Sequence, residues 1–123
     1  MDKKTLNNLL TRESRMVWDA LCEIYPALAW HKCPKIALNG RLWRTAGFCH
    51  QNDNLVELGY KFFNKQYTHN MIDIILPHEI IHQADFNLFG ESEKNCGHGA
   101  KWCEIMVQYG LAPEPFHEMD IKR

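Results

Sequence analysis

Residues 71–82 read MIDIILPHEIIH, and this stretch contains the most informative pattern in the chain. Residues four apart on a helix lie on the same face, so His78 and His82 can offer two imidazole nitrogens to one metal ion. Glu79 lies about 100° further round the helix than His78. Its carboxylate therefore lies beside such an ion, where it can take a proton from a bound water, as in zinc hydrolases with an H-E-x-x-H helix.

The alternative to a metal site is a chance pattern on a solvated helix face. The residues that precede the motif or lie inside it are mostly apolar: Met71, Ile72, Ile74, Ile75, Leu76, Ile80 and Ile81. This composition predicts a buried helix, and a buried helix rarely carries polar side chains without partners because their burial is costly. We therefore interpret the two histidines and the glutamate as a metal site.

A catalytic zinc site needs a third protein ligand, which should come from another element. His98 lies between Gly97 and Gly99, and glycines allow the backbone to approach a metal closely. Cys96 is the competing candidate, since a thiolate is also a good zinc ligand. We favour His98, because a set of three histidines leaves the bound water more nucleophilic.

Three segments carry a resemblance to a known family: RTAG at 44–47, HEIIH at 78–82 and GHGAKW at 97–102. With these segments in this order, the chain resembles the SprT-like metalloproteases, whose eukaryotic members include the Spartan DNA–protein crosslink proteases. The resemblance spans about residues 35–110. It implies zinc on His78, His82 and His98, with Glu79 as the general base.

The sequence departs from the family pattern in two places. Many members continue into a four-cysteine zinc ribbon or a DNA-binding tail, but this sequence has no C-x-x-C, so we expect a compact form without the ribbon. Pro77 removes a helical hydrogen bond directly before the motif. Either the helix is kinked there or a new turn begins at Pro77, and both leave His78 and His82 on a common turn.

Length and composition predict one small domain over residues 1–123, with 46% hydrophobic residues and no apolar run long enough for a membrane span. The N-terminus leads into a polar, amphipathic stretch and not into a signal core. The cysteines are odd in number and irregularly spaced: Cys22, Cys33, Cys49, Cys96 and Cys103. This argues against a disulfide framework and for free thiols in a reducing cytoplasm.

Charge is unevenly distributed along the chain. Residues 1–50 hold eight Lys or Arg against four acidic residues, and the remainder holds six against eleven. Cations alternate with aromatic residues in one basic stretch: Trp30, His31, Lys32, Lys35, Arg41, Trp43 and Arg44. An ordinary solvated face explains this stretch, and the alternative is a surface for single-stranded DNA, although a pI near 6.6 is not that of a strong DNA binder.

Apolar periodicity and turn residues predict the following elements: helices over 4–25, 68–88 and 99–109, a strand over 35–38, and a β-hairpin over 42–49 and 55–58. We therefore expect a zincin-like α+β fold. In it a small, mostly antiparallel sheet packs on the H-E-x-x-H helix. An extended peptide could join the sheet edge beside the metal.

The expected activity is zinc-dependent peptide hydrolysis in which Glu79 moves the proton. Four residues are unranked candidates for a second oxyanion donor: Tyr60, Tyr67, His69 and Tyr109. Asp85, seven positions after His78, is either a hydrogen-bond partner of a ligand histidine or a surface carboxylate. The other histidines are expected to be non-ligands: His31, His50, His69 and His117.

Two other classes of function remain open from the sequence. One is a binding or inhibitory module that keeps zinc but has little proteolytic activity, and the other is a metal-dependent nuclease. A site of three histidines with an adjacent glutamate suits attack on a carbonyl better than phosphate chemistry, where paired metals are common. We expect a protein substrate, single-stranded DNA as a candidate activator, no membrane partner and a monomer.

Overall fold

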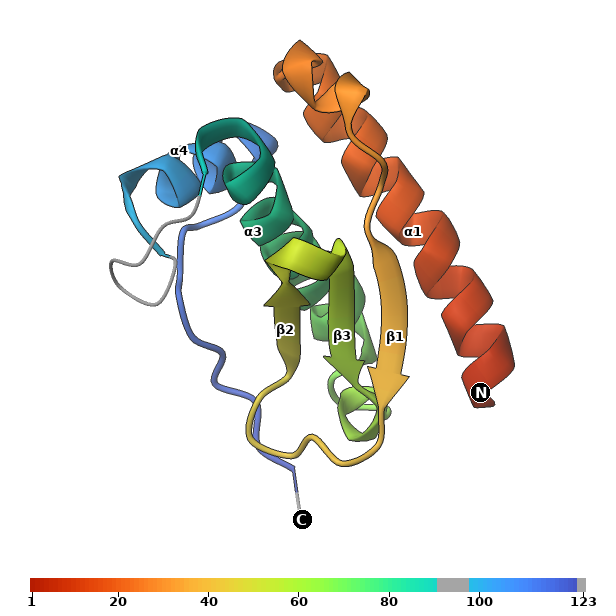
Figure 1. Ribbon diagram of the computed structural model, residues 1–123. Coiled ribbons are helices and arrows are strands. Elements are labelled where there is room, and N and C mark those ends of the chain that lie inside the picture. Colours follow the sequence, from red (N-terminus) through yellow and green to blue (C-terminus); the bar gives the residue numbers. More distant parts are fainter. Residues whose placement is uncertain (91–97, 122–123) are drawn as a thin grey trace.

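The computed structural model describes residues 1–90 and 98–121, which form an α+β fold of helices around a small sheet (Figure 1). The longer helices are α1 (Lys3–Ile24), α3 (Leu76–Phe89) and α4 (Ala100–Tyr109). The strands are β1 (Lys35–Asn39), β2 (Gly47–His50) and β3 (Leu55–Gly59). Short helical turns join them: η1 (Pro26–Trp30), η2 (Gln51–Asp53), η3 (Tyr60–Phe62) and α2 (Thr68–Asn70). The three predicted helical regions and the hairpin are confirmed.

Local sequence signals set the ends of α1 and α4. The Asp2 side chain accepts a hydrogen bond of 2.7 Å from the Thr5 N–H and so caps the start of α1. Helix α1 ends at Ile24, two residues before Pro26, which lies in the first turn of η1. Helix α4 ends at Gly110, whose positive φ of 109° suits a helix C-terminus.

The sheet has the strand order β1-β3-β2, and β3 pairs in parallel with β1 and antiparallel with β2. The prediction of a mostly antiparallel sheet is therefore wrong, because the sheet is mixed. The chain reverses between β1 and β2 and again between β2 and β3, so β1 and β3 run in the same direction. Strand β3 then lies between the other two, which leaves β2 at an edge of the sheet.

The predicted helix over 68–88 consists of three consecutive segments, with the π-helical turn η4 (Met71–Ile75) between α2 and α3. At its end the Leu76 N–H donates to the carbonyl of Met71, five residues back. Pro77 follows in the first turn of α3 and has no N–H to donate. The wider π turn gives the proline ring room beside the preceding carbonyls. The geometry before the motif is thus a π turn, and His78 and His82 share a turn of α3 as predicted.

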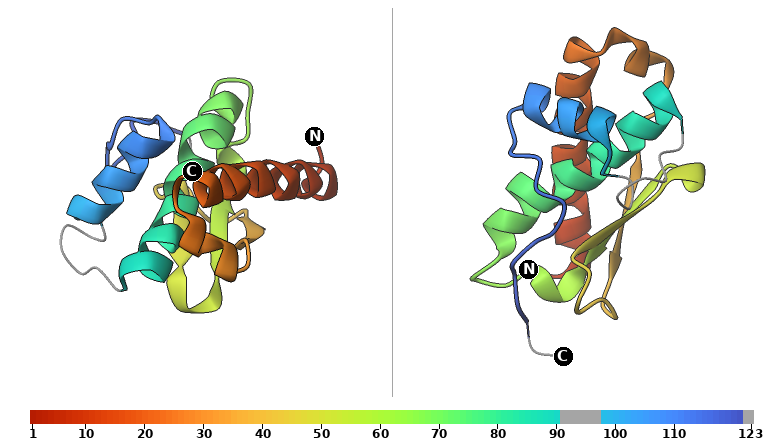
Figure 2. Two further views of the ribbon diagram at one scale, coloured as in Figure 1. Left: turned by 90° about the horizontal axis from the view of Figure 1, so that it is seen from above. Right: turned by 90° about the vertical axis from the view of Figure 1, so that its left-hand side faces the viewer.

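Helix α3 is the central element, in contact with β2, α1 and α4 (Figure 2). The core around it is built from apolar side chains of every layer, and its largest fully buried members are Trp18, Trp102 and Phe62. The segment after α4 runs back past β2 (Figure 1). In the part of the chain that the structure describes, no helix combines the length and apolar character needed to cross a membrane.

Candidate metal centre

Helix α3 carries His78, Glu79 and His82 in the interior of the protein, because it packs against β2, α1 and α4. Every residue from Leu76 to Asp85 is buried. The side chains of His78, Glu79 and His82 nevertheless open onto a cleft, and these residues keep 8%, 8% and 7% of their surface exposed, respectively. The apolar sequence around the motif therefore produces a buried helix with three polar side chains on a single concave surface.

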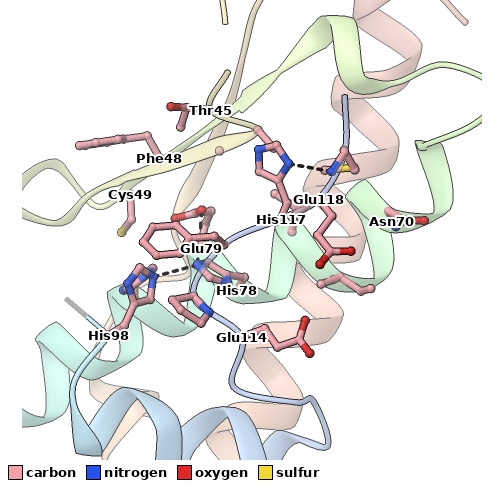
Figure 3. A pocket seen from close by; sticks show the side chains of 18 of the residues that line it. Thr45, Phe48, Cys49, Asn70, His78, Glu79, His98, Glu114, His117 and Glu118 are labelled. Atoms are coloured by element: carbon pink, nitrogen blue, oxygen red, sulfur yellow. Dashed lines mark hydrogen bonds and ion pairs between the residues drawn. The ribbon is translucent and has the colours of Figure 1, made fainter. Parts of the chain in front are cut away.

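His98 reaches these residues from the segment directly before α4. Its Nε2 atom lies 3.0 Å from Nε2 of His82 and 3.2 Å from Nε2 of His78 (Figure 3). Nitrogens held at 2.0–2.1 Å by a tetrahedral zinc ion are roughly 3.3 Å apart, so the observed spacing is close to that of a ligand set. The three histidines form a cluster that could hold a metal ion.

The electrostatics of the cluster favour neutral imidazoles. Burial, together with the neighbouring His98 and His117, lowers the pKa of His78 to about 4. Burial, together with His78 and His98, likewise lowers the pKa of His82 to about 3. A neutral imidazole has a free nitrogen lone pair, which is the form that binds a metal. The residues present therefore fit a divalent ion in the protonation state they hold at neutral pH.

Glu79 lies beside the three histidines and not among them. Its Oε2 atom is 3.9 Å from Nε2 of His78. Burial raises the pKa of Glu79 to about 8, because the ionised carboxylate loses hydration there. A carboxyl group whose pKa is near neutral can both accept and return a proton.

Trp102 of α4 packs against the rings of all three histidines. Its ring centroid lies 4.9 Å from that of His78, 5.2 Å from that of His82 and 4.6 Å from that of His98, and it is stacked on His82 at 19°. The sequence predicts Trp102 only as a buried helix residue. His98 lies outside α4, so helical spacing does not predict this contact, which depends on how the segment before α4 is packed.

We expect Trp102→Ala to lower the free energy of unfolding by about 3–5 kcal/mol and to weaken zinc binding, because three rings lose a common packing surface. Trp102→Phe is the milder variant. It keeps an aromatic ring and removes an indole N–H that has no acceptor among the described residues. Thermal unfolding and zinc competition against a chromophoric chelator measure both effects. Unchanged zinc affinity in both variants would contradict a role for Trp102 in holding the histidines.

The cluster opens into a cleft of about 1320 Å³ with two different walls. Figure 3 shows Thr45, Phe48 and Cys49 from β2 and the residues before it on one side, and Glu114 and Glu118 from the segment after α4 on the other. The cleft borders the edge strand, since residues 44–49 and 51 line it. A cleft beside the edge of a sheet suits an extended chain that adds as a strand.

Hydrogen bonds of His117 hold the segment after α4 against the opposite wall of this cleft. Its Nε2 atom lies 2.9 Å from the carbonyl oxygen of Arg44, and its Nδ1 atom accepts from the Met119 N–H at 3.1 Å. These two contacts leave Nε2 as the protonated nitrogen, which donates to Arg44. That His117 is not a metal ligand stays a prediction, and no local sequence pattern indicates its contact with Arg44, 73 positions away.

The structure gives no support to several predicted supporting roles. Among the described residues Asp85 makes no hydrogen bond to a histidine, although it is buried and burial raises its pKa to about 6. The Tyr60 hydroxyl donates to the Met1 carbonyl, and of the four oxyanion candidates only Tyr67 lines the cleft. Its hydroxyl accepts from the Asp120 N–H. The second oxyanion donor therefore stays unassigned.

Other predicted features lie outside the cluster. The competing ligand Cys96 lies outside the described residues, and the four described cysteines are free. His50 approaches Glu57 at 3.8 Å, and His31 and His69 are exposed. In the basic stretch Trp30 is 90% exposed, and the Arg44 guanidinium lies over the Trp43 ring at 4.9 Å. These exposed groups fit a binding surface, but DNA contact stays a prediction.

Comparison with known proteins gives one match. The model of the SprT-like family matches residues 20–121, a range that includes all three segments of the sequence signature. The comparisons with curated proteins and with solved structures gave no match. The matched range contains both walls of the cleft and the whole histidine cluster.

Proposed function

The chain belongs to the SprT-like family, and on this basis we propose that it is a zinc-dependent metalloendopeptidase of the zincin-like type. The observation that carries the proposal is the convergence of three imidazole nitrogens, two from α3 and one from the segment before α4, beside a buried carboxylate and inside a cleft. A purely structural site would have no need of the open cleft or of the adjacent glutamate.

His78, His82 and His98 would hold the ion. Zinc is the metal we propose, because three neutral imidazoles at this spacing match its preferred nitrogen ligands and leave a fourth position open. When bound, zinc supplies Lewis-acid chemistry, which makes water acidic near neutral pH and polarises a carbonyl group. Trp102 keeps the three rings in position from the side opposite the cleft.

Glu79 is the proposed general base. It takes the proton from the water that attacks the scissile carbonyl and then gives this proton to the leaving amine. Its position next to the histidines and its raised pKa support this role.

The edge strand β2 is the proposed docking site for an extended peptide. The Gly59 N–H donates to the Ala46 carbonyl at 2.8 Å, so Ala46 and alternate residues after it face β3. The backbone groups of Gly47 and Cys49 then point away from β3, toward the cleft. A substrate can pair with them as an added strand, with its carbonyl groups close to Glu79.

We further propose that the substrates include DNA-associated proteins and that single-stranded DNA activates cleavage. The Trp43–Arg44 pair supports this, because Arg44 also lines the cleft and stacked arginine and aromatic side chains can bind bases. The free thiols of the described cysteines support a cytoplasmic location.

The test is cleavage of casein and of a DNA-bound protein by purified protein with measured zinc content, with and without single-stranded DNA. We expect about one zinc per chain, loss of cleavage after chelation, recovery on adding zinc, and faster cleavage of the DNA-bound protein with DNA. Zinc binding without any cleavage would favour the binding or inhibitory module. Equal rates with and without DNA would contradict the activation proposal alone.

A further inference from the structure

The last two residues of the RTAG segment, Ala46 and Gly47, line the cleft at the histidine cluster. Ala46 is fully buried, with 1% exposure, and its carbonyl pairs with β3. Gly47 starts β2 and lies directly against Glu79. A Cβ atom added to Gly47 would be 2.9 Å from Cγ and 3.2 Å from Oε2 of Glu79.

These distances leave no room for a side chain at Gly47. A contact under 3.0 Å forces a neighbour to move, and the closest neighbour is the Glu79 side chain. The other near atom is Cδ2 of Leu58, at 3.1 Å, on the adjacent strand. Glu79 itself lies on a buried helix and is only 8% exposed, so little free space surrounds its side chain apart from the cleft that it lines.

We propose that Gly47 is a positioning residue for Glu79. Its missing side chain lets the carboxylate rest against the edge strand at the residue whose backbone groups face the cleft. The peptide and the base therefore meet at the same point of β2. The inference rests on the proposed function for its effect on cleavage, whereas the steric contact can be tested without cleavage.

The activity test is Gly47→Ala, with Gly40→Ala as the matched control. Gly40 has one near neighbour, Lys3 Nζ at 3.6 Å, and its φ is not positive, so a methyl group fits there. We expect Gly47→Ala to lower kcat by about 10²-fold, with KM and zinc content nearly unchanged, because a displacement of about 1 Å at a reacting group has this effect. Gly40→Ala should cleave like the wild type. Loss of activity in proportion to lost zinc or lost folded protein would overturn the proposal.

The stability test is a double-mutant cycle with Glu79→Ala, read by thermal unfolding of the zinc-loaded proteins. In the wild-type background we expect Gly47→Ala to lower Tm by roughly 4–8 °C, because the added methyl overpacks the site. In the Glu79→Ala background the same change should cost less than half as much, since two of the three nearest atoms belong to the part of the Glu79 side chain that is removed. Equal costs in both backgrounds would overturn the proposed contact.

The two tests separate the failure of the inference from the failure of the proposed function. A wild-type protein that cleaves nothing contradicts the function, but the double-mutant cycle still decides whether Gly47 holds Glu79 in place. A wild-type protein that cleaves, together with a fully active Gly47→Ala variant, contradicts the inference alone.

Discussion

Glu79→Gln is expected to reduce kcat/KM for casein by about 10²–10⁴-fold while the zinc content stays at the wild-type level. Glutamine has the shape of glutamate but cannot accept and return a proton, and loss of a general base has an effect of this size. The structure favours an intact fold in this variant, because burial already disfavours the charged form of Glu79. Initial rates of casein cleavage and metal analysis of the same samples measure the two quantities.

Glu104→Gln is the matched control for this variant. Glu104 lies on α4, its side chain is 54% exposed, and it is 3.8 Å from Lys101, outside the cleft. It should cleave at the wild-type rate. Loss of zinc in Glu79→Gln would instead make Glu79 a ligand, and undiminished cleavage would remove it as the base. An unchanged biological effect of Glu79→Gln would favour the binding module.

The second large effect is expected for His98→Ala, which should lose stoichiometric zinc and with it all measurable cleavage. Removal of a hydrogen-bond partner of a ligand already weakens metal binding roughly 10–100-fold, and removal of the ligand itself should exceed this. The Nε2 atom of His98 is the one that lies close to both other histidines, so the remaining pair cannot close the site. Zinc content after dialysis against a weak chelator measures the loss.

Two controls decide between the candidate third ligands. His31→Ala removes an exposed histidine and should keep zinc and activity. Cys96→Ser removes the competing thiol and should also keep both. Zinc retained in His98→Ala but lost in Cys96→Ser would reverse the assignment and would replace the three-histidine set by one with a thiolate.

The helices and the hairpin could be predicted from the sequence, because the geometry of a helix or a strand fixes the spacing of its apolar residues. The apolar repeats predict α1 and α4 to within about two residues, and Pro26 and Gly110 set their ends. The hairpin of β2 and β3 follows from the polar turn between two apolar runs. The position of β1 did not follow, since its parallel pairing with β3 depends on contacts about 20 positions apart.

The histidine cluster likewise depends partly on local spacing and partly on tertiary packing. Two histidines four apart share a helix face in any α-helix, so residues 78–82 alone predict two of the three converging nitrogens. The flanking glycines single out His98 as a candidate, but only packing of α4 against α3 brings it within 3.0 Å of His82. Closing the loop between His82 and His98 costs conformational entropy, so the two side chains meet only when packing of the whole core offsets this cost.

Thus the sequence by itself determined the helices, the hairpin and a pair of histidines beside a glutamate, because each depends on neighbours within one or two turns. Tertiary structure alone decided the mixed sheet, the support of three rings by Trp102 and the contact of His117 with Arg44. The absence of a side chain at Gly47 also acquires its meaning only when β2 packs on α3. These contacts join segments far apart in the chain, and their partners are selected by the packing of the complete core and not by local spacing.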